Sequence, residues 1–231
     1  TLWPAPQSEW NWPPPPQLDG EPYSVSISED GIYMESEKDS LTGLQFGKMF
    51  GFNPIDTVFK ITYTVKNLND TPRYAAPWEV TRVQGGLSFF PLGEEPVMRQ
   101  SNLKSVSEVD GIVWYEYEPD SLDTSQKLFS SGAEGWLAHV TSGLLFVKKV
   151  EDIHPLKTAP GQGEVEIFAS KPFPYIELEN HGKYTLLEPN EFMEWRVKWY
   201  LREYPETIEP MAGNASLMDF VRSLISSGQN K

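Results

Sequence analysis

The chain consists largely of short segments in which apolar and polar residues alternate. Residues 59–66, FKITYTVK, place an apolar side chain at every second position, and residues 193–201 follow the same pattern. A period of two is typical of a strand with one buried and one solvated face. We predict further strands at 23–27, 74–83, 112–117, 136–140, 144–150, 164–170 and 173–181.

Turn residues separate these segments. Asn67–Pro72 is rich in asparagine, aspartate and proline, and Thr141–Gly143 predicts a tight hairpin. Pro77, inside a predicted strand, favours an edge, a bulge or a strand start. Successive strands with frequent turns predict an all-β protein that forms one domain over residues 1–231, a sandwich or a barrel.

One helix is predicted at the C-terminal end, over residues 214–227. Asn214 or Ser216 can cap its first turn. We expect it to pack on the outside of the domain as a terminal brace. Apolar residues recur at the helical spacing at Leu217, Phe220, Val221, Leu224 and Ile225.

The first sixteen residues combine three tryptophans with six prolines. Proline fixes φ and removes a backbone donor, so this segment is neither a helix nor a central strand. A solvated linker would not carry three tryptophans. We therefore predict an ordered loop that packs on the domain or on its ligand-binding face.

Composition limits the partners of the protein. A net charge of −14 would repel a nucleic acid backbone and an anionic membrane surface, so neither is expected to bind. The absence of cysteine excludes disulfides, thiolate nucleophiles and cysteine-ligated metals. The chain begins at Thr1, and removal of a signal peptide would favour a periplasmic or secreted location over the cytoplasm; trimming of the sequence is the alternative.

The segment KPFPYIELENHGKY carries the richest chemistry. In a strand, Glu177, Glu179 and His181 share one face with Tyr175, and the apolar residues between them face the other way. Adjacent carboxylates are costly on a buried face, so a ligand-facing surface explains them better. There they can accept hydrogen bonds from sugar hydroxyls, and one with a raised pKa can act as a general base. A solvated face balanced by lysines is the other interpretation.

The same glutamates and His181 could bind a metal, because carboxylates and imidazole suit several divalent ions. A single strand seldom offers three ligands in convergent geometry. We therefore expect neither a metal nor a cofactor.

Two further clusters offer candidate binding groups. In APWEVTRV, Glu79 and Arg82 fall on opposite faces of a regular strand unless a bulge intervenes. Arg82 can bond to vicinal hydroxyls or pair with a carboxylate, and Trp78 can stack on a pyranose ring or belong to the core. In GWLAHVTSGLLFVKKV, His139 suits general acid catalysis, although a lone strand histidine is more often structural. Lys148 and its neighbour face opposite sides, so only one can reach a site.

The order of these segments resembles a known family. The VKNLNDTPRYAAPWEVTRV unit, the GWLAHVTSGLLFVKKV hairpin and the final YIELENHGKYTLLEPNEFMEWRVKWYL unit resemble galactose mutarotase-like proteins. The LWPAPQ…WPPP stretch makes the DUF4380 proteins the most similar branch. The resemblance implies a large antiparallel β-sandwich with a sugar site on its concave face, and some of the initial strands of that fold are expected to be missing here.

The resemblance also implies an aldose 1-epimerase-like reaction. A late-strand glutamate, here Glu177 or Glu179, would be the general base, and a histidine would protonate the ring oxygen. The histidine motif of the family is replaced here by residues 77–80, PWEV, so the acid would have to be His139, His181 or Glu79.

We therefore expect a carbohydrate-binding, epimerase-like protein, with a non-catalytic sugar-binding module as the alternative. Glu177, Glu179 and His139 are the candidate catalytic residues. The candidate substrate-binding residues are Glu79, Arg82, Trp78, His181, Lys148 and Trp12, and Trp3 joins them in the alternative.

Overall fold

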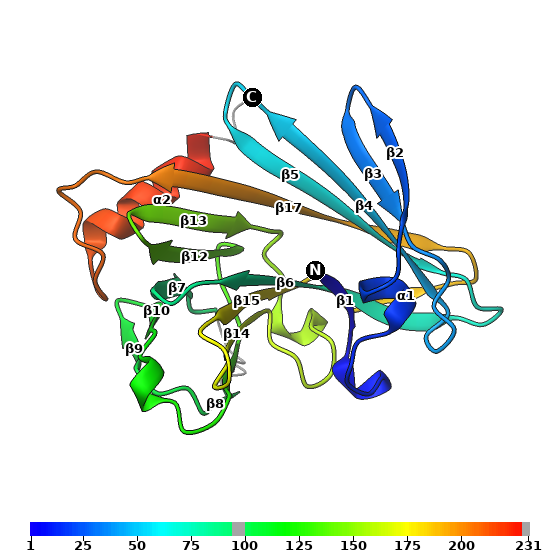
Figure 1. Ribbon diagram of the computed structural model, residues 1–231, viewed down its shortest axis with the longest axis horizontal. Helices are drawn as coiled ribbons and strands as arrows, with labels where there is room; N and C mark the ends of the chain where they lie inside the picture. Colours follow the sequence, from blue (N-terminus) through cyan, green and yellow to red (C-terminus); the bar gives the residue numbers. More distant parts are fainter. Residues whose placement is uncertain (94–99, 228–231) are drawn as a thin grey trace.

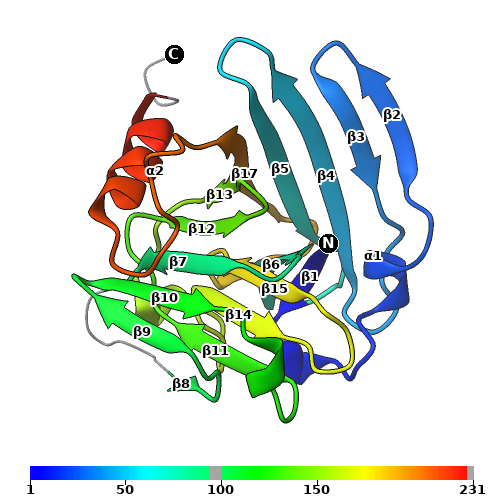
Figure 2. The same cartoon turned by 60° about the vertical axis from the view of Figure 1, so that its left-hand side comes forward.

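Two antiparallel sheets face each other in the computed structural model, which describes residues 1–93 and 100–227 (Figures 1 and 2). The larger sheet has ten strands, in the order β2 (Ser24–Ser28), β3 (Gly31–Glu35), β4 (Leu44–Asn53), β5 (Val58–Asn67), β17 (Phe192–Glu203), β13 (Leu144–Lys149), β12 (Trp136–Thr141), β7 (Leu87–Pro91), β10 (Ile112–Glu116) and β9 (Val106–Val109).

The smaller sheet has seven strands. Its order is β1 (Leu2–Ala5), β6 (Arg73–Val83), β15 (Ile176–His181), β14 (Val165–Ala169), β11 (Gln126–Ser130) and β8 (Gln100–Ser101), with β16 (Thr185–Leu187) also paired to β6. Two α-helices, α1 (Pro16–Asp19) and α2 (Ala215–Ser227), and three short 3₁₀ turns complete the described chain. The predicted antiparallel, all-β sandwich with a C-terminal helix is confirmed.

The alternation of apolar and polar residues along each strand determines which side chains lie between the two sheets. Ile176 and Leu178 of β15 pack with Ile167 of β14 and with Phe90 and Leu137 of the larger sheet. Because successive strand residues point to opposite faces, the glutamates between these apolar residues face away from the larger sheet. The outer face of the smaller sheet is therefore polar although its inner face is core.

Two predicted strands differ from the expected form. The strand predicted at 173–181 begins at Ile176, because Pro172 and Pro174 lack backbone donors and the chain turns there, with the Tyr175 amide bonded to the Phe173 carbonyl. β2 is exposed along its whole length rather than half-buried, because it is the outermost strand of its sheet.

β6 runs through Pro77 without a bulge. β15 pairs with β6 from Trp78 to Val83, and β16 pairs with it from Arg73 to Ala75, so Pro77 lies where one partner gives way to the next. The register of β6 with β1 is unbroken from Ala76 to Glu79, which keeps the alternation of β6 intact, while the opposite side has one extra residue in the segment 182–184. The proline is thus neither on an edge strand nor at a strand start, and the irregularity beside it lies in the opposite segment rather than in β6.

The predicted hairpin at Thr141–Gly143 and the predicted C-terminal helix are both present in the structure. β12 and β13 pair across Ser142 and Gly143, whose φ angles of 49° and 78° give the left-handed turn typical of two-residue hairpins. Asn214 caps α2, because its Oδ1 accepts hydrogen bonds from the amides of Ser216 and Leu217. The buried side of α2 packs on the face of the larger sheet that points away from the smaller one.

The tryptophan-rich N-terminal segment is ordered and packs on the domain, as predicted, but it is not a loop throughout. It contributes β1 as an edge strand beside β6, and it buries Trp3 and Trp10 against the outer face of the smaller sheet. Trp12 remains 65% exposed. Within the described residues, no helix is long and apolar enough to cross a membrane.

Candidate functional site

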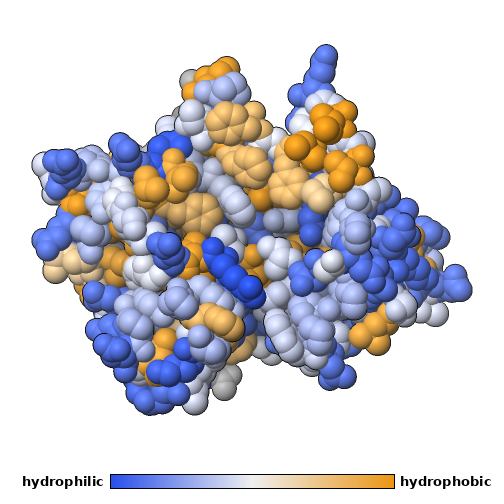
Figure 3. Space-filling view, in the orientation of Figure 1, coloured by the Kyte–Doolittle hydropathy of each residue, from blue (hydrophilic) through white to orange (hydrophobic). Residues whose placement is uncertain are grey.

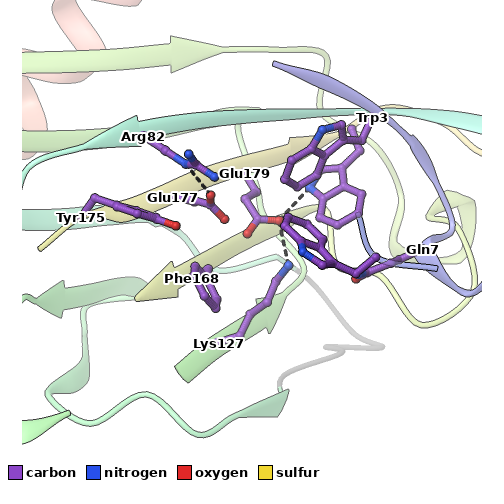
Figure 4. A pocket seen from close by; sticks show the side chains of 10 residues that line it. Trp3, Gln7, Arg82, Lys127, Phe168, Tyr175, Glu177 and Glu179 are labelled. Carbon is purple, nitrogen blue, oxygen red and sulfur yellow. Dashed lines mark hydrogen bonds and ion pairs between the residues drawn. The ribbon is translucent and has the colours of Figure 1, made fainter. Parts of the chain in front are cut away.

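A pocket of about 280 Å³ opens on the outer face of the smaller sheet (Figure 4). It joins β15 to side chains from β6, β11 and β14 and to the N-terminal segment. Its lining consists of Trp3, Gln7, Trp12, Trp78, Arg82, Lys127, Phe168, Tyr175, Glu177 and Glu179. Aromatic walls around charged groups are typical of sites that orient a polar ligand with an apolar side.

Glu177 and Arg82 form one charged pair in this pocket. They are cross-strand neighbours on β15 and β6, and Nε of Arg82 donates to Oε1 of Glu177 at 2.8 Å. The Glu177 side chain is 8% exposed and the Arg82 side chain 56% exposed. The guanidinium also lies over the ring of Tyr175, 4.6 Å from its centroid. This carboxylate thus has a cation beside it that remains accessible from solvent.

Glu179 has different neighbours. Nε1 of Trp78 donates to its Oε2 at 2.7 Å, and Nζ of Lys127 donates to the same oxygen at 2.8 Å. The Glu179 residue is 1% exposed. Figure 4 shows its other oxygen turned away from Lys127, on the side of Glu177. The two strand glutamates thus occupy one pocket in contrasting surroundings.

Glu166 lies behind Glu179, directly opposite it on β14. Its Oε1 accepts hydrogen bonds from Nε2 of Gln162 at 2.8 Å and from the amide of Gly163 at 2.7 Å. Nε2 of His181 is 3.2 Å from the same oxygen, and Nζ of Lys127 is 2.6 Å from Oε2. Glu166 is therefore the best-supported carboxylate of the cluster.

These surroundings push the two carboxyl pKa values apart. Burial raises the pKa of Glu179 to about 8, with Lys127 opposing the rise and Glu166 adding to it. Burial acts in the same direction on Glu166, but His181 and Lys127 outweigh it and hold that pKa at about 2. Burial would lower the pKa of Lys127, yet both glutamates hold it above its usual value. Glu166 is thus held ionised by His181 and Lys127, whereas burial favours the protonated form of Glu179.

Glu166, Glu179 and His181 also form a potential metal-ligand group, since one ligand atom from each lies within 4.8 Å of the others. The trio differs from the one considered in the sequence, because Glu166 replaces Glu177. Nζ of Lys127 contacts both carboxylates and supplies the positive charge that they require. The donor set therefore matches a lysine-neutralised cluster better than a vacant cation site.

Tryptophans form one wall of the pocket. Trp3 of β1 packs edge-on against Trp78 of β6 at 5.0 Å and against Trp12 at 5.8 Å. Tyr175 lies across the pocket from Trp3 in Figure 4 and stacks on Phe173. Flat apolar surfaces thus stand on both sides of the carboxyl pair.

His139 lies outside this pocket. It is 1% exposed on β12 of the larger sheet, and its Nδ1 is 3.0 Å from Oγ of Ser88. Burial lowers its pKa to about 4. The structure therefore does not bring His139 together with Glu177 and Glu179, because β12 belongs to the opposite layer of the sandwich.

Glu79 and Lys148 are also absent from the pocket lining. Both are fully buried, and they pair between the two sheets at 3.0 Å. Tyr63 donates to Oε1 of Glu79 at 2.8 Å, and Nζ of Lys148 donates to the Leu178 carbonyl at 2.9 Å. Glu79 faces inward because it alternates with Trp78 and Val80 on an unbroken strand.

His181 shares the outer face with the glutamates but does not line the pocket. It is fully buried behind Trp78, whose ring stacks on it at 5.1 Å. Its contact is with Glu166. His181 is thus positioned to support the carboxyl cluster from beneath rather than to meet a ligand.

Sequence reasoning missed several residues of this site. Glu166 and Phe168 alternate with the core residues of β14, and the antiparallel pairing of β14 with β15 places them beside Glu179 and Glu177. That pairing could have been inferred from two consecutive predicted strands. Lys127 carried no local signal, because β11 reaches the site only through the order of strands in the sheet. The missed residues are Gln7, Lys127, Glu166 and Phe168.

Solved structures with a similar fold include a galactose mutarotase-like protein from Lactobacillus casei ATCC 334, with a TM-score of 0.52 and 14% identity over 78% of this chain and 73% of that one. A candidate aldose 1-epimerase from Klebsiella pneumoniae subsp. pneumoniae MGH 78578 has a TM-score of 0.54 and 11% identity, covering 89% of this chain and 57% of that one.

A TPR-domain containing protein from Parabacteroides distasonis ATCC 8503 has a TM-score of 0.55 and 14% identity over 79% of this chain. The match spans only 34% of that protein. The sequence matches no curated protein. The family model of the domain of unknown function DUF4380 matches residues 4–202. The chain therefore belongs to the DUF4380 family, and it has a galactose mutarotase-like sandwich fold.

Proposed function

We propose that this protein binds a neutral carbohydrate in the tryptophan-walled pocket and catalyses interconversion at the anomeric carbon of the sugar. The observation that carries the proposal is the projection of Glu177 and Glu179 from one strand into one pocket. The fold similarity to galactose mutarotase-like proteins supports the same substrate class.

The pocket has the chemistry for a sugar. A pyranose ring has an apolar face that can pack on the exposed Trp12, and hydroxyls that can bond to Arg82 and the carboxyl groups. Burial of the site strengthens such hydrogen bonds, because the local dielectric is low.

Charge favours a neutral sugar over a sugar phosphate. Arg82 is paired with Glu177, and Lys127 with Glu166 and Glu179. No cation in the described pocket lining lacks a carboxylate partner, so a phosphate would have to displace an existing ion pair. The net charge of −14 acts in the same direction.

The alternative function is a non-catalytic sugar-binding module. It is favoured by the placement of His139 and His181, neither of which lines the pocket. In that case Trp12, Trp78 and Arg82 would hold the sugar, and the carboxyl groups would only accept hydrogen bonds from hydroxyls.

Freshly dissolved α-D-galactose and α-D-glucose distinguish the two functions. Saturation-transfer NMR reports binding, and the rate at which the β-anomer signal grows reports catalysis. We expect binding together with anomer exchange faster than in buffer. In a Glu177→Gln/Glu179→Gln double variant we expect the added rate to vanish. Binding without faster exchange would favour the module, and retained exchange in the double variant would sink the assignment to these glutamates.

Glu194→Gln is the matched control. Glu194 is also a strand glutamate, but it lies on β17 of the larger sheet, outside the pocket, where it pairs with Arg196. Its replacement should leave both binding and exchange unchanged.

A further inference from the structure

The two pocket glutamates have partners of different kinds. Glu177 pairs with Arg82, a cation whose side chain is more than half exposed. Within the described residues, the cation that contacts the Glu179 carboxyl is Lys127, which also contacts the buried Glu166. The two carboxyls therefore face the pocket with unequal support for a negative charge.

Competition within the cluster decides which buried carboxyl carries a proton. Lys127 can neutralise one charge, and two carboxylates contact it. The ionised form of Glu166 is the better stabilised of the two, because Glu166 also accepts hydrogen bonds from Nε2 of Gln162 and from the Gly163 amide. Burying a second, uncompensated carboxylate would be costly, so Glu179 takes up a proton.

The free oxygen of Glu179 is the place for this proton. Trp78 and Lys127 both donate to Oε2, and the described residues offer no donor to Oε1. Figure 4 shows that Oε1 lies on the side of Glu177, within the pocket. A proton on Oε1 would thus point toward a bound ligand rather than into the protein.

We infer that Glu179 is the general acid that protonates the sugar ring oxygen, and that Glu177 is the general base that accepts the anomeric hydroxyl proton. The inference rests on the proposed function, and it supplies the acid that no histidine of the described pocket lining provides. Two carboxyl groups on one strand would then act as acid and base, because their different surroundings give chemically identical groups different pKa values.

The step balances without any further reactant. Glu177 removes the proton from O1, the O1–H electron pair forms the C1=O1 double bond, and the C1–O5 pair moves to O5. O5 takes the proton of Glu179, which gives the open-chain aldehyde. After rotation about C1–C2, O5 attacks the other face of C1, Glu179 recovers its proton, and Glu177 returns its proton to O1.

Lys127 is the nearest rival for the acid. Both glutamates stabilise its ammonium form and hold its pKa above the usual value, so it gives up a proton less readily than Glu179. The charged or titratable groups that face Glu179 are Lys127 from β11, Glu166 from β14, Arg82 from β6, Lys148 from β13, and Glu177 and His181 from its own strand.

The first test is a direct titration. The side-chain carboxyl carbons are followed by ¹³C NMR in glutamate-labelled protein, with the Glu179 signal assigned by its loss in Glu179→Gln. We expect this signal to titrate near pH 8. A carboxyl of Glu179 that is ionised at pH 6 would overturn the inference, whether or not the protein is active.

The second test is the pH profile of α-D-galactose anomer exchange. In the wild type we expect the added rate to fall as the pH rises through about 8, and Glu179→Gln should lose at least about 90% of it at pH 7. In Glu166→Gln, the charge of Glu166 is gone and Lys127 contacts Glu179 without a competing carboxylate, so the pKa of Glu179 should fall. The pH at which the rate declines on the alkaline side should then move down by about one pH unit or more. A purely structural role of Glu166 would lower the rate without moving this pH.

The outcomes separate the two claims. If Glu179→Gln keeps the wild-type rate and pH profile, the acid assignment fails while the proposed function stands. If the wild type accelerates neither α-D-galactose nor α-D-glucose, the proposed function fails and the acid role with it. Should Glu166→Gln fail to fold, the ¹³C titration of the wild type and the Glu179→Gln rate still decide the question.

Discussion

Glu166 and Glu179 lie directly opposite each other on neighbouring strands, and both contact Nζ of Lys127. Both carboxyl groups are almost completely buried, while the lysine is 19% exposed. The ammonium of Lys127 thus affects both the stability of the smaller sheet and the protonation of Glu179 in its pocket.

Removing that ammonium should destabilise the fold. In Lys127→Met, two buried carboxyl groups lose their shared cation, and we expect the free energy of unfolding to fall by about 3–5 kcal/mol at pH 7. Urea unfolding followed by circular dichroism measures the change. Lys104→Met is the control, because Lys104 pairs with Asp123 in solvent, so its replacement should cost far less than that of Lys127. Equal losses in the two variants would contradict this account.

The proton on Glu179 predicts how stability depends on pH. Its folded pKa of about 8 exceeds the ordinary value of 4.5, so the stability that it contributes is complete below about pH 4.5 and is lost as the pH rises through about 8. Glu166 has the opposite sign, since its contribution is present above pH 4.5 and is lost as the pH falls toward 2.

Glu179→Gln should therefore flatten the stability curve between pH 5 and 8. Urea unfolding midpoints at pH 5, 6, 7 and 8 are compared in the wild type and the variant, and the wild type should decline more steeply. Parallel curves would mean that Glu179 is already ionised at pH 5. The decline below pH 4.5 should persist in the variant, because Glu166 is unchanged.

Trp12 should matter for ligands but not for stability. Its side chain is 65% exposed at the pocket edge, so Trp12→Ala removes little buried surface and should change the free energy of unfolding by less than about 0.5 kcal/mol. A lost stacking surface should weaken sugar binding about tenfold. Titration of α-D-galactose followed by NMR measures this, and Phe192→Ala, an exposed aromatic on β17, should leave the affinity unchanged.

The pair between the sheets should behave as a unit. Glu79→Gln or Lys148→Met alone leaves one buried charge without its partner, and each should cost about 3–5 kcal/mol. The double variant should be clearly more stable than the sum of the two losses, as a double-mutant cycle by urea unfolding would show. Additive losses would mean that the two side chains do not interact across the sandwich.

The face of each strand was predictable because alternation is a local property. Glu177 and Glu179 were placed on one face of β15, and Glu79 and Arg82 on opposite faces of β6, from spacing alone. The structure agrees at each of these positions, because the register of β6 with its neighbours is unbroken. Asn214 could be named as a helix cap for the same reason, since capping depends on residues two and three positions away.

The partners of those residues were not predictable, because they depend on strand order. Lys127 reaches Glu179 across one intervening strand, β14, from a segment 52 residues away in the chain. His139 and Lys148 looked equally suited to the site, but β12 and β13 belong to the other sheet. The pattern of a single strand specifies which face a side chain occupies, and only the assembled sheet specifies what that face meets.

β6 carries the pocket on one side and the inter-sheet ion pair on the other. Trp78 and Arg82 point outward, and Glu79 points inward to Lys148. A slip of one residue against β15 would bury the guanidinium in the core and expose the glutamate to the pocket. Wrong alignments of this strand thus place charges in apolar surroundings on both faces at once. The charged residues of β6 therefore also disfavour a misfolded sheet in which this strand is shifted by one residue.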